Sequence, residues 1–123
     1  MSERRSGAVD SAELRRLRQR IDDVDRRIVG LINERAELTR AVGVEKSKLG
    51  RAIRDAARER EVLLRVSIAN AGPTPQADLL AIYRRLIAAA RALEAGQRER
   101  LRRDEPDGPN RGGPEGQGEA PPA

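Results

Sequence analysis

Apolar residues recur at alternating intervals of three and four through the first half of the chain. The positions are Leu14, Leu17, Ile21, Val24, Ile28, Leu31, Leu38 and Val42. This spacing is that of a heptad seam, which places the side chains along one side of a helix. Asp10-Ser11-Ala12-Glu13 precedes the seam and resembles a capping box. The pattern predicts a first helix that starts at this box and runs to about residue 46.

Two shorter helices are predicted to follow. The second covers about 53–70, after a break at Gly50. "AGPTPQ" then forces a turn, in which Thr74 is a good N-cap and Pro75 suits the first helical position. The third covers about 75–96 and has apolar residues on one side. No segment has the pattern of a strand, so the predicted fold class is all-α, with one long and two shorter helices per chain.

The length of the first helix predicts a second copy of the chain. A helix of about 35 residues is about 50 Å long, and the other two helices are each about half that length. Two short helices cannot cover a seam along the whole of such a rod. We therefore expect an intertwined homodimer in which the long helices pack together.

The two ends of the chain lack apolar periodicity. "EPDGPNRGGPEGQGEAPPA" is rich in Gly, Pro and acidic residues, and cannot bury enough surface to offset its ordering entropy. We expect 104–123 to be disordered and 96–103 to be a fraying helical end. The resulting domains are a flexible N-terminus (1–9), a helical domain (10–96) and a Gly/Pro/acid-rich tail (97–123).

Composition narrows the chemistry. The chain has no Cys, no His and a single aromatic residue, Tyr83. Disulfides, thiol nucleophiles, Ser-His-Asp triads and the usual zinc sites are therefore excluded. No apolar stretch suits a signal peptide or a membrane span, so a cytoplasmic location is the default expectation. The net charge of +5 is compatible with binding a nucleic acid or an anionic small molecule, and also with a role in solubility alone.

Charged residues interrupt or continue the apolar stripe of each predicted helix. Arg35 takes a seam position between Leu31 and Leu38, where an unpaired charge is costly. Ion pairs, or a register-setting role for Arg35, would explain any one of these positions. Taken together, the set favours a dry pocket for a multiply charged anion. Its members are Arg18, Arg35 and Lys46 on the first helix, Asp55, Arg58 and Glu59 on the second, and Glu94 on the third.

The same residues carry a family resemblance. "LRQRIDDVDRRIVGLINERAELTRAVGVEKSK", "IRDAARERE" and the final "IYRRLIAAARALE" resemble the all-helical chorismate mutase family over about residues 14–95. The resemblance implies an intertwined helical dimer that converts chorismate to prephenate in aromatic amino-acid biosynthesis, with no cofactor and no metal. Each of its two active sites would receive Arg18 from the partner chain.

The resemblance also implies roles for individual residues. Arg18, Arg35 and Arg58 would grip the two carboxylates of chorismate. Lys46 and a protonated Glu94 would donate to the ether oxygen, while Glu59 and the backbone near Asp55 would hold the ring hydroxyl. Many members carry Ser and Gln where this chain has Ala90 and Glu94. The lost Ser puts one polar contact to the substrate in doubt.

Two alternatives stay open. Relatives of this fold act on isochorismate, by pyruvate elimination, or on amino-deoxychorismate, and share the carboxylate grip. Outside the enzyme class, a basic helical dimer could bind nucleic acid. The chain has no recognisable nucleic-acid motif, no aromatic stacking platform and no one-sided basic run, so we expect neither a nucleic acid nor a membrane as partner.

Overall fold

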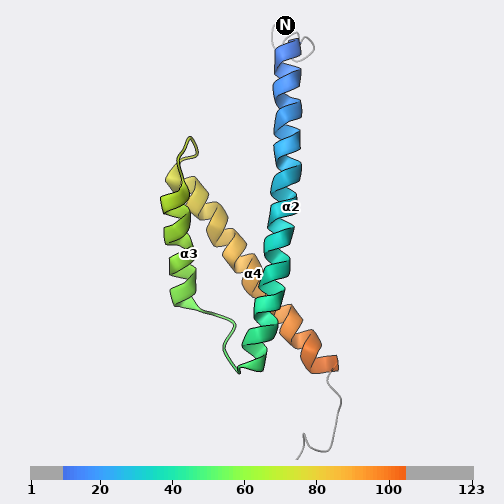
Figure 1. Ribbon diagram of the computed structural model, residues 1–123, viewed down its shortest axis with the longest axis vertical. Coiled ribbons are helices and arrows are strands. Elements are labelled where there is room, and N and C mark those ends of the chain that lie inside the picture. Colours follow the sequence, from blue (N-terminus) through green and yellow to red (C-terminus); the bar gives the residue numbers. More distant parts are fainter. Residues whose placement is uncertain (1–9, 105–123) are drawn as a thin grey trace, which may run out of the picture.

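The computed structural model describes residues 10–104 of the chain. They form three helices: α2 (Ala12–Lys48), α3 (Ala56–Ala69) and α4 (Gln76–Asp104). No strand occurs among these residues, so the predicted all-α class with one long helix is confirmed (Figure 1). No helix in the described part of the chain has the length and apolarity needed to cross a bilayer.

The helix ends follow local sequence signals. The Ser11 side chain caps α2 by accepting a hydrogen bond from the Leu14 backbone N–H at 3.0 Å. Gly50 ends the first segment with a φ of +69°, a left-handed conformation that favours glycine. The Pro75 carbonyl accepts the first backbone bonds of α4, from Asp78 and Leu79. Pro75 therefore takes the capping position predicted for Thr74, one residue later than expected.

Helix α4 is longer than the sequence pattern predicts. It continues to Asp104, beyond residue 96, where we placed the end of the helical domain. The segment from Gln97 to Asp104 contains no Gly or Pro, and Glu99 pairs with Arg102 one turn later. The last turns of α4 have no apolar stripe that packs on another helix. Local helix propensity and such ion pairs stabilise them instead. Asp104, predicted to begin the disordered tail, is thus helical, while the rest of that tail (105–123) and the predicted flexible N-terminus (1–9) lie outside the described residues.

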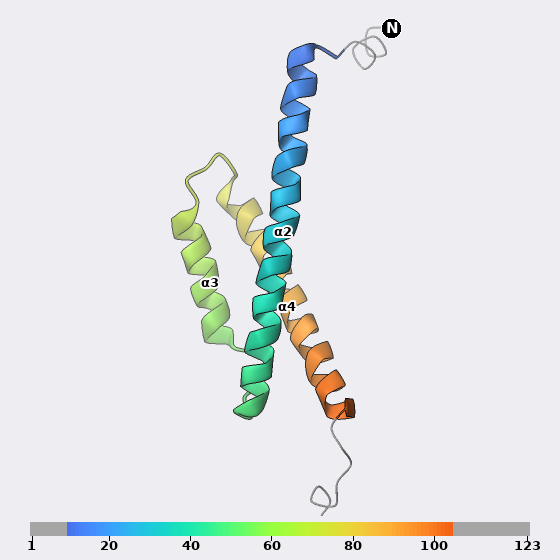
Figure 2. The same ribbon diagram turned by 45° about the vertical axis from the view of Figure 1, so that its right-hand side comes forward.

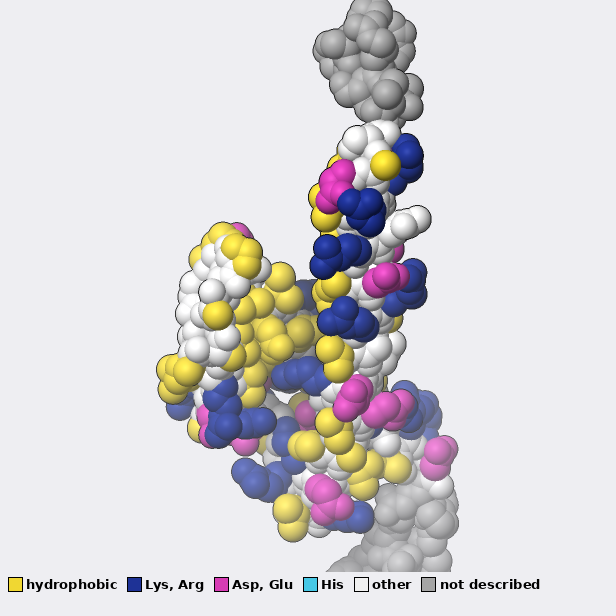
Figure 3. All heavy atoms as spheres, turned by 45° about the horizontal axis from the view of Figure 1, so that its top comes forward, with side chains coloured by type: hydrophobic (Ala, Val, Ile, Leu, Met, Phe, Trp, Pro, Cys, Tyr) yellow, Lys and Arg dark blue, Asp and Glu magenta, His cyan; other side chains and the backbone are white. Residues whose placement is uncertain are grey.

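Helix α4 holds the three helices together. It crosses the C-terminal half of α2 and packs against α3, whereas α2 and α3 do not pack on each other (Figures 1 and 2). The N-terminal half of α2 projects beyond both other helices, and every residue from 15 to 34 is exposed. Hydrophobic side chains line the space between α3 and α4 and continue along α2 (Figure 3). The predicted seam is thus uncovered in a single chain.

The tightest packing lies where α4 crosses α2. Gly43 is buried there, and a Cβ atom added to it would lie 3.2 Å from the Cγ atom of Glu94. Ile87 is the only buried hydrophobic side chain among residues 10–104, and Glu94 is the only buried charged one. The small core of the single chain therefore depends on how closely α4 approaches α2 at Gly43.

This close approach predicts opposite effects of one substitution at two glycines of α2. Gly43→Leu should lower the denaturation midpoint, because its side chain displaces Glu94 and moves α4 away. Gly30→Leu is the matched control, since nothing lies within 4 Å of a Cβ atom there. It should raise stability by about 0.5–1 kcal/mol through helix propensity. Urea unfolding at one protein concentration tests both, and equal midpoints would contradict the packing account.

Candidate active site

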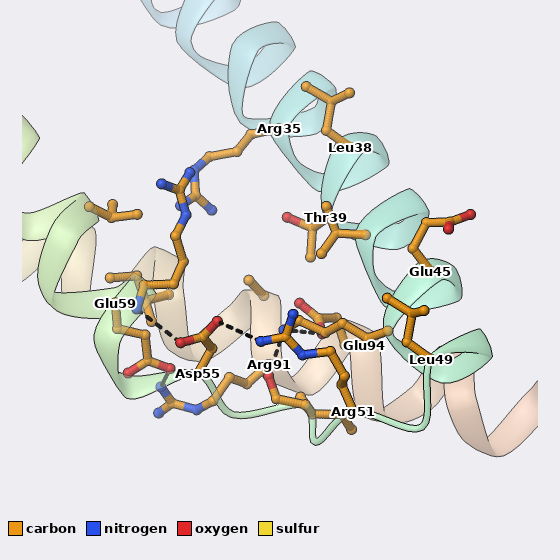
Figure 4. A pocket seen from close by; sticks show the side chains of 17 residues that line it. Arg35, Leu38, Thr39, Glu45, Leu49, Arg51, Asp55, Glu59, Arg91 and Glu94 are labelled. Atoms are coloured by element: carbon orange, nitrogen blue, oxygen red, sulfur yellow. Dashed lines mark hydrogen bonds and ion pairs between the residues drawn. The ribbon is translucent and has the colours of Figure 1, made fainter.

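A pocket of about 580 Å³ opens between the three helices, in the half of the molecule where α4 crosses α2. Seven of the eight residues proposed from the sequence line it. Helix α2 contributes Arg35 and Lys46, the start of α3 contributes three, and α4 contributes two (Figure 4). The α3 and α4 residues are Asp55, Arg58, Glu59, Ala90 and Glu94.

Arg35 forms the upper wall of the pocket. It points from α2 into the pocket (Figure 4), and its guanidinium carbon lies 5.9 Å from the centroid of the Tyr83 ring. This stacking supports the side chain by a cation–π interaction. Within residues 10–104 no carboxylate pairs with Arg35. A half-buried guanidinium in this setting is ready to bind an anion.

Lys46 and Glu94 form a buried pair at the floor of the pocket. The Nζ atom of Lys46 lies 3.1 Å from Oε1 of Glu94 and donates a second bond of 2.7 Å to the Ile53 carbonyl. Their side chains are only 16% and 8% exposed. Because Gly43 lacks a side chain, Glu94 can sit this close to α2. A Lys ammonium group and a Glu carboxyl group are thus held next to one another in a partly buried setting.

The start of α3 presents both charge and backbone to the pocket. The Asp55 side chain accepts from the Arg58 backbone N–H at 3.0 Å and so caps α3. Arg51, in the loop before it, approaches Asp55 to 3.9 Å. Asp55 therefore fixes the beginning of the helix at the pocket edge, which is a structural task that the sequence pattern did not reveal.

The Arg58 side chain forms an ion pair with Glu61, a residue outside the pocket. Its Nη1 atom lies 2.9 Å from the carboxylate of Glu61, which Arg65 also approaches to 2.7 Å. Hydrogen bonds from Arg65 and then Arg58 hold the pKa of the exposed Glu61 below its ordinary value. Glu61 thus competes with any bound anion for the Arg58 guanidinium.

Two basic residues of the pocket are absent from the sequence-based set. Arg91 donates from Nη1 to Oε2 of Glu59 at 2.6 Å, and Arg51 approaches Asp55 from the loop (Figure 4). Arg91 follows Ala90 directly and so falls beside the apolar stripe of α4, while Arg51 lies in a segment with no periodicity. The excess of basic residues around 51–60 is a sequence signal for Arg51, and it does not extend to Arg91.

Arg18 does not reach this pocket. It lies on the projecting half of α2, where its Nη1 atom pairs with Asp10 at 2.8 Å. Arg18 precedes Arg35 by 17 positions in the sequence, which is about 26 Å along the axis of a helix. An Arg18 side chain can enter such a pocket only from another copy of the chain.

The lining defines what the pocket can do. Five basic and four acidic side chains surround it, and Thr39 is the only hydroxyl-bearing residue among them. Of the acids, Glu45 turns away from the others (Figure 4) and pairs with Lys48 at 3.3 Å. No group of three or more possible metal ligands occurs within residues 10–104. The arrangement suits binding a polyanion and donating hydrogen bonds to it.

Comparison with known proteins gives the family. Residues 17–95 match the family described as chorismate mutase type II. The chain belongs to this family. It is 41% identical over 86 residues to the bifunctional chorismate mutase/prephenate dehydratase of Aquifex aeolicus (strain VF5), a match that covers 67% of the chain. The chain spans about a quarter, 24%, of that chorismate mutase relative.

A solved structure has the same fold. Chorismate mutase (form II) from Thermus thermophilus is 30% identical to the chain and aligns with a TM-score of 0.66. The alignment covers 68% of this chain and 94% of the Thermus chain. The aligned helices of this chorismate mutase family member therefore match nearly the whole of the Thermus chorismate mutase chain.

The competition for Arg58 leads to a prediction about affinity. Glu61→Gln removes the charge that holds Arg58, so a dicarboxylate should bind about two- to fivefold more tightly. Glu99→Gln is a matched control, because Glu99 also has a pKa lowered by a neighbouring arginine, Arg102, and does not line the pocket. The affinity of the Glu99→Gln variant for the dicarboxylate should stay unchanged. Titration calorimetry distinguishes the two variants, and equal affinities would show that Glu61 does not compete.

Proposed function

We propose that the chain catalyses the rearrangement of chorismate to prephenate, a step of aromatic amino-acid biosynthesis. The observation that carries the proposal is the composition of one pocket. Arg35 and Arg58 stand at its walls, and the buried Lys46–Glu94 pair lies at its floor. These groups can bind a dicarboxylate and donate to a third oxygen. Membership of the chorismate mutase type II family supports the same substrate.

Substrate positioning is the first part of the proposed mechanism. Chorismate carries two carboxylates, and a guanidinium can bind each through two parallel hydrogen bonds. Arg35 and Arg58 approach from α2 and α3, so the two grips come from different elements. They hold the substrate in the compact conformer whose reacting carbons are close. Such positioning accounts for a large share of the barrier reduction in a unimolecular reaction.

Charge stabilisation is the second part. One carbon–oxygen bond breaks as one carbon–carbon bond forms, and all the electrons stay within the substrate. Negative charge grows on the ether oxygen during this step. Lys46 and a protonated Glu94 donate hydrogen bonds to that oxygen, which lowers the energy of the transition state. Glu59 and the backbone near Asp55 accept from and orient the ring hydroxyl, while Ala90 offers no polar contact.

The site is proposed to be complete only in a homodimer. The apolar seam of α2 is 41–63% exposed in the single chain, at Leu17, Ile21, Val24, Ile28, Leu31, Leu38 and Val42. A row this long is normally covered by a partner. A second α2 packed along it in an intertwined arrangement would carry its own projecting half toward this pocket. Arg18 of the partner subunit would then supply the remaining carboxylate contact.

The other assignments have less support. An isochorismate pyruvate lyase or an amino-deoxychorismate mutase would use the same carboxylate grip, but no feature of the pocket favours either. A nucleic-acid-binding dimer would need a one-sided basic surface. The basic residues of α2 and α3 are instead interleaved with acids, as in Arg16–Glu13 and Arg65–Glu61.

The purified chain should consume chorismate and form prephenate in equal amounts, without added metal or cofactor. Loss of the chorismate absorbance gives the rate, and proton NMR of the product gives its identity. Release of pyruvate would assign the chain to the lyases instead. Retention on a phosphate polymer that falls with salt, together with no turnover, would support nucleic-acid binding.

Glu94 should make the reaction pH-dependent. Only its protonated form can donate to the ether oxygen, so kcat/KM should fall as pH rises and Glu94 ionises. Glu94→Gln supplies a permanent amide donor and should abolish this fall. Kinetics from about pH 4.5 to 9 compare the two proteins. Glu45→Gln serves as the control, because Glu45 turns away from the other acids of the pocket and pairs with Lys48, and its profile should match the wild type. A fall that persists in Glu94→Gln would leave Lys46 as the only donor.

A further inference from the structure

An ion pair joins α3 to α4 beside the pocket. Nη1 of Arg91 lies 2.6 Å from Oε2 of Glu59, although the two residues are 32 positions apart in the sequence. The Glu59 side chain is 19% exposed and that of Arg91 is 36% exposed, so solvent screens the pair only in part. Among the ion pairs of residues 10–104, it is the one that connects α3 to α4.

The pair separates the pocket from a second hollow. Glu59, Ile87 and Arg91 line both spaces, and the second measures about 310 Å³ between α3 and α4. Three more arginines surround that hollow: Arg54, Arg60 and Arg84. Nη2 of Arg54 already lies 3.7 Å from Oε1 of Glu59. The Glu59 carboxylate therefore has cations on the side away from the substrate, which attract it out of the pocket.

We propose that Arg91 is a positioning residue that holds Glu59 at the pocket wall for the substrate's ring hydroxyl. This inference rests on the function proposed above. Arg91 occupies one carboxylate oxygen and leaves the remaining acceptor positions to the hydroxyl. It also balances a negative charge that would otherwise repel a dicarboxylate substrate. Arg91 thus acts on the reaction through Glu59.

The two consequences of losing Arg91 both raise KM. Glu59 would turn toward Arg54 and the second hollow, and its unbalanced charge would weaken binding of the dianion. Neither change touches the ether oxygen, where Lys46 and Glu94 act. Binding of the ground state and of the transition state should therefore suffer alike, which leaves kcat close to the wild-type value.

A double-mutant cycle tests this on the full chain. The variants are Arg91→Met, Arg91→Lys and Glu59→Gln, together with the double variants Arg91→Met/Glu59→Gln and Arg91→Lys/Glu59→Gln. Arg85→Met is the control, because Arg85 lies on the same helix, is exposed and lines neither space. Steady-state kinetics with chorismate and thermal unfolding are measured for each protein, at one concentration.

We expect Arg91→Met to raise KM about tenfold or more, with kcat changed by less than about threefold. In the Glu59→Gln background the same substitution should change KM by less than about twofold. Arg91→Lys should recover part of the loss, since it restores the charge but not the planar fork. Arg85→Met should match the wild type.

Equal effects of Arg91→Met in both backgrounds would overturn the proposal, because Arg91 would then act independently of Glu59. A wild-type KM in Arg91→Met would overturn it as well. If Arg91→Met fails to fold, the decision passes to Arg91→Lys, whose KM must rise in the wild-type background and not in Glu59→Gln. A wild-type chain without turnover would refute the proposed function itself, which is a separate outcome.

Discussion

The close crossing of α2 and α4 at Gly43 is the constraint on which the rest of the structure depends. Because Gly43 has no side chain, the backbone of α2 can approach Glu94 closely; the Cγ atom of Glu94 would lie only 3.2 Å from an added Cβ. This contact buries Glu94 and brings it to Lys46, and it places Ile87 in the small core. The fold and the pocket floor are therefore set by one packing interaction.

The distribution of burial explains why a pocket full of charges can persist. A buried ion pair is costly unless its partners are well satisfied, and Lys46 meets this condition through Glu94 and the Ile53 carbonyl. Glu59 meets it through Arg91, and Asp55 through its capping bond. Arg35 stacks on Tyr83 and has no carboxylate partner within residues 10–104. The pocket thus leaves one wall ready for an anion while its other charges hold each other in place.

Most of the fold was predictable because periodicity reports directly on helix faces. The three-and-four spacing identified α2, and charges within apolar stripes identified six pocket residues. Two kinds of feature were not predictable. The Arg91–Glu59 contact depends on tertiary packing across 32 positions, and the pairing of Arg58 with Glu61 depends on a rotamer. We expected 96–103 only as a fraying helical end, whereas α4 continues as a helix to Asp104, because its last turns follow helix propensity rather than an apolar stripe.

Subunit complementation tests the central claim, a carboxylate-binding site shared between two chains, most directly. Arg18→Ala and Arg35→Ala should each be nearly inactive alone. After equimolar mixing and subunit exchange, half of the dimers should be mixed, each with one intact site, so about a quarter of wild-type activity should return. Arg35→Ala mixed with Arg58→Ala should recover nothing, because both residues belong to the same chain's pocket. A mixture of Arg18→Ala and Arg35→Ala that stays inactive would contradict the shared site.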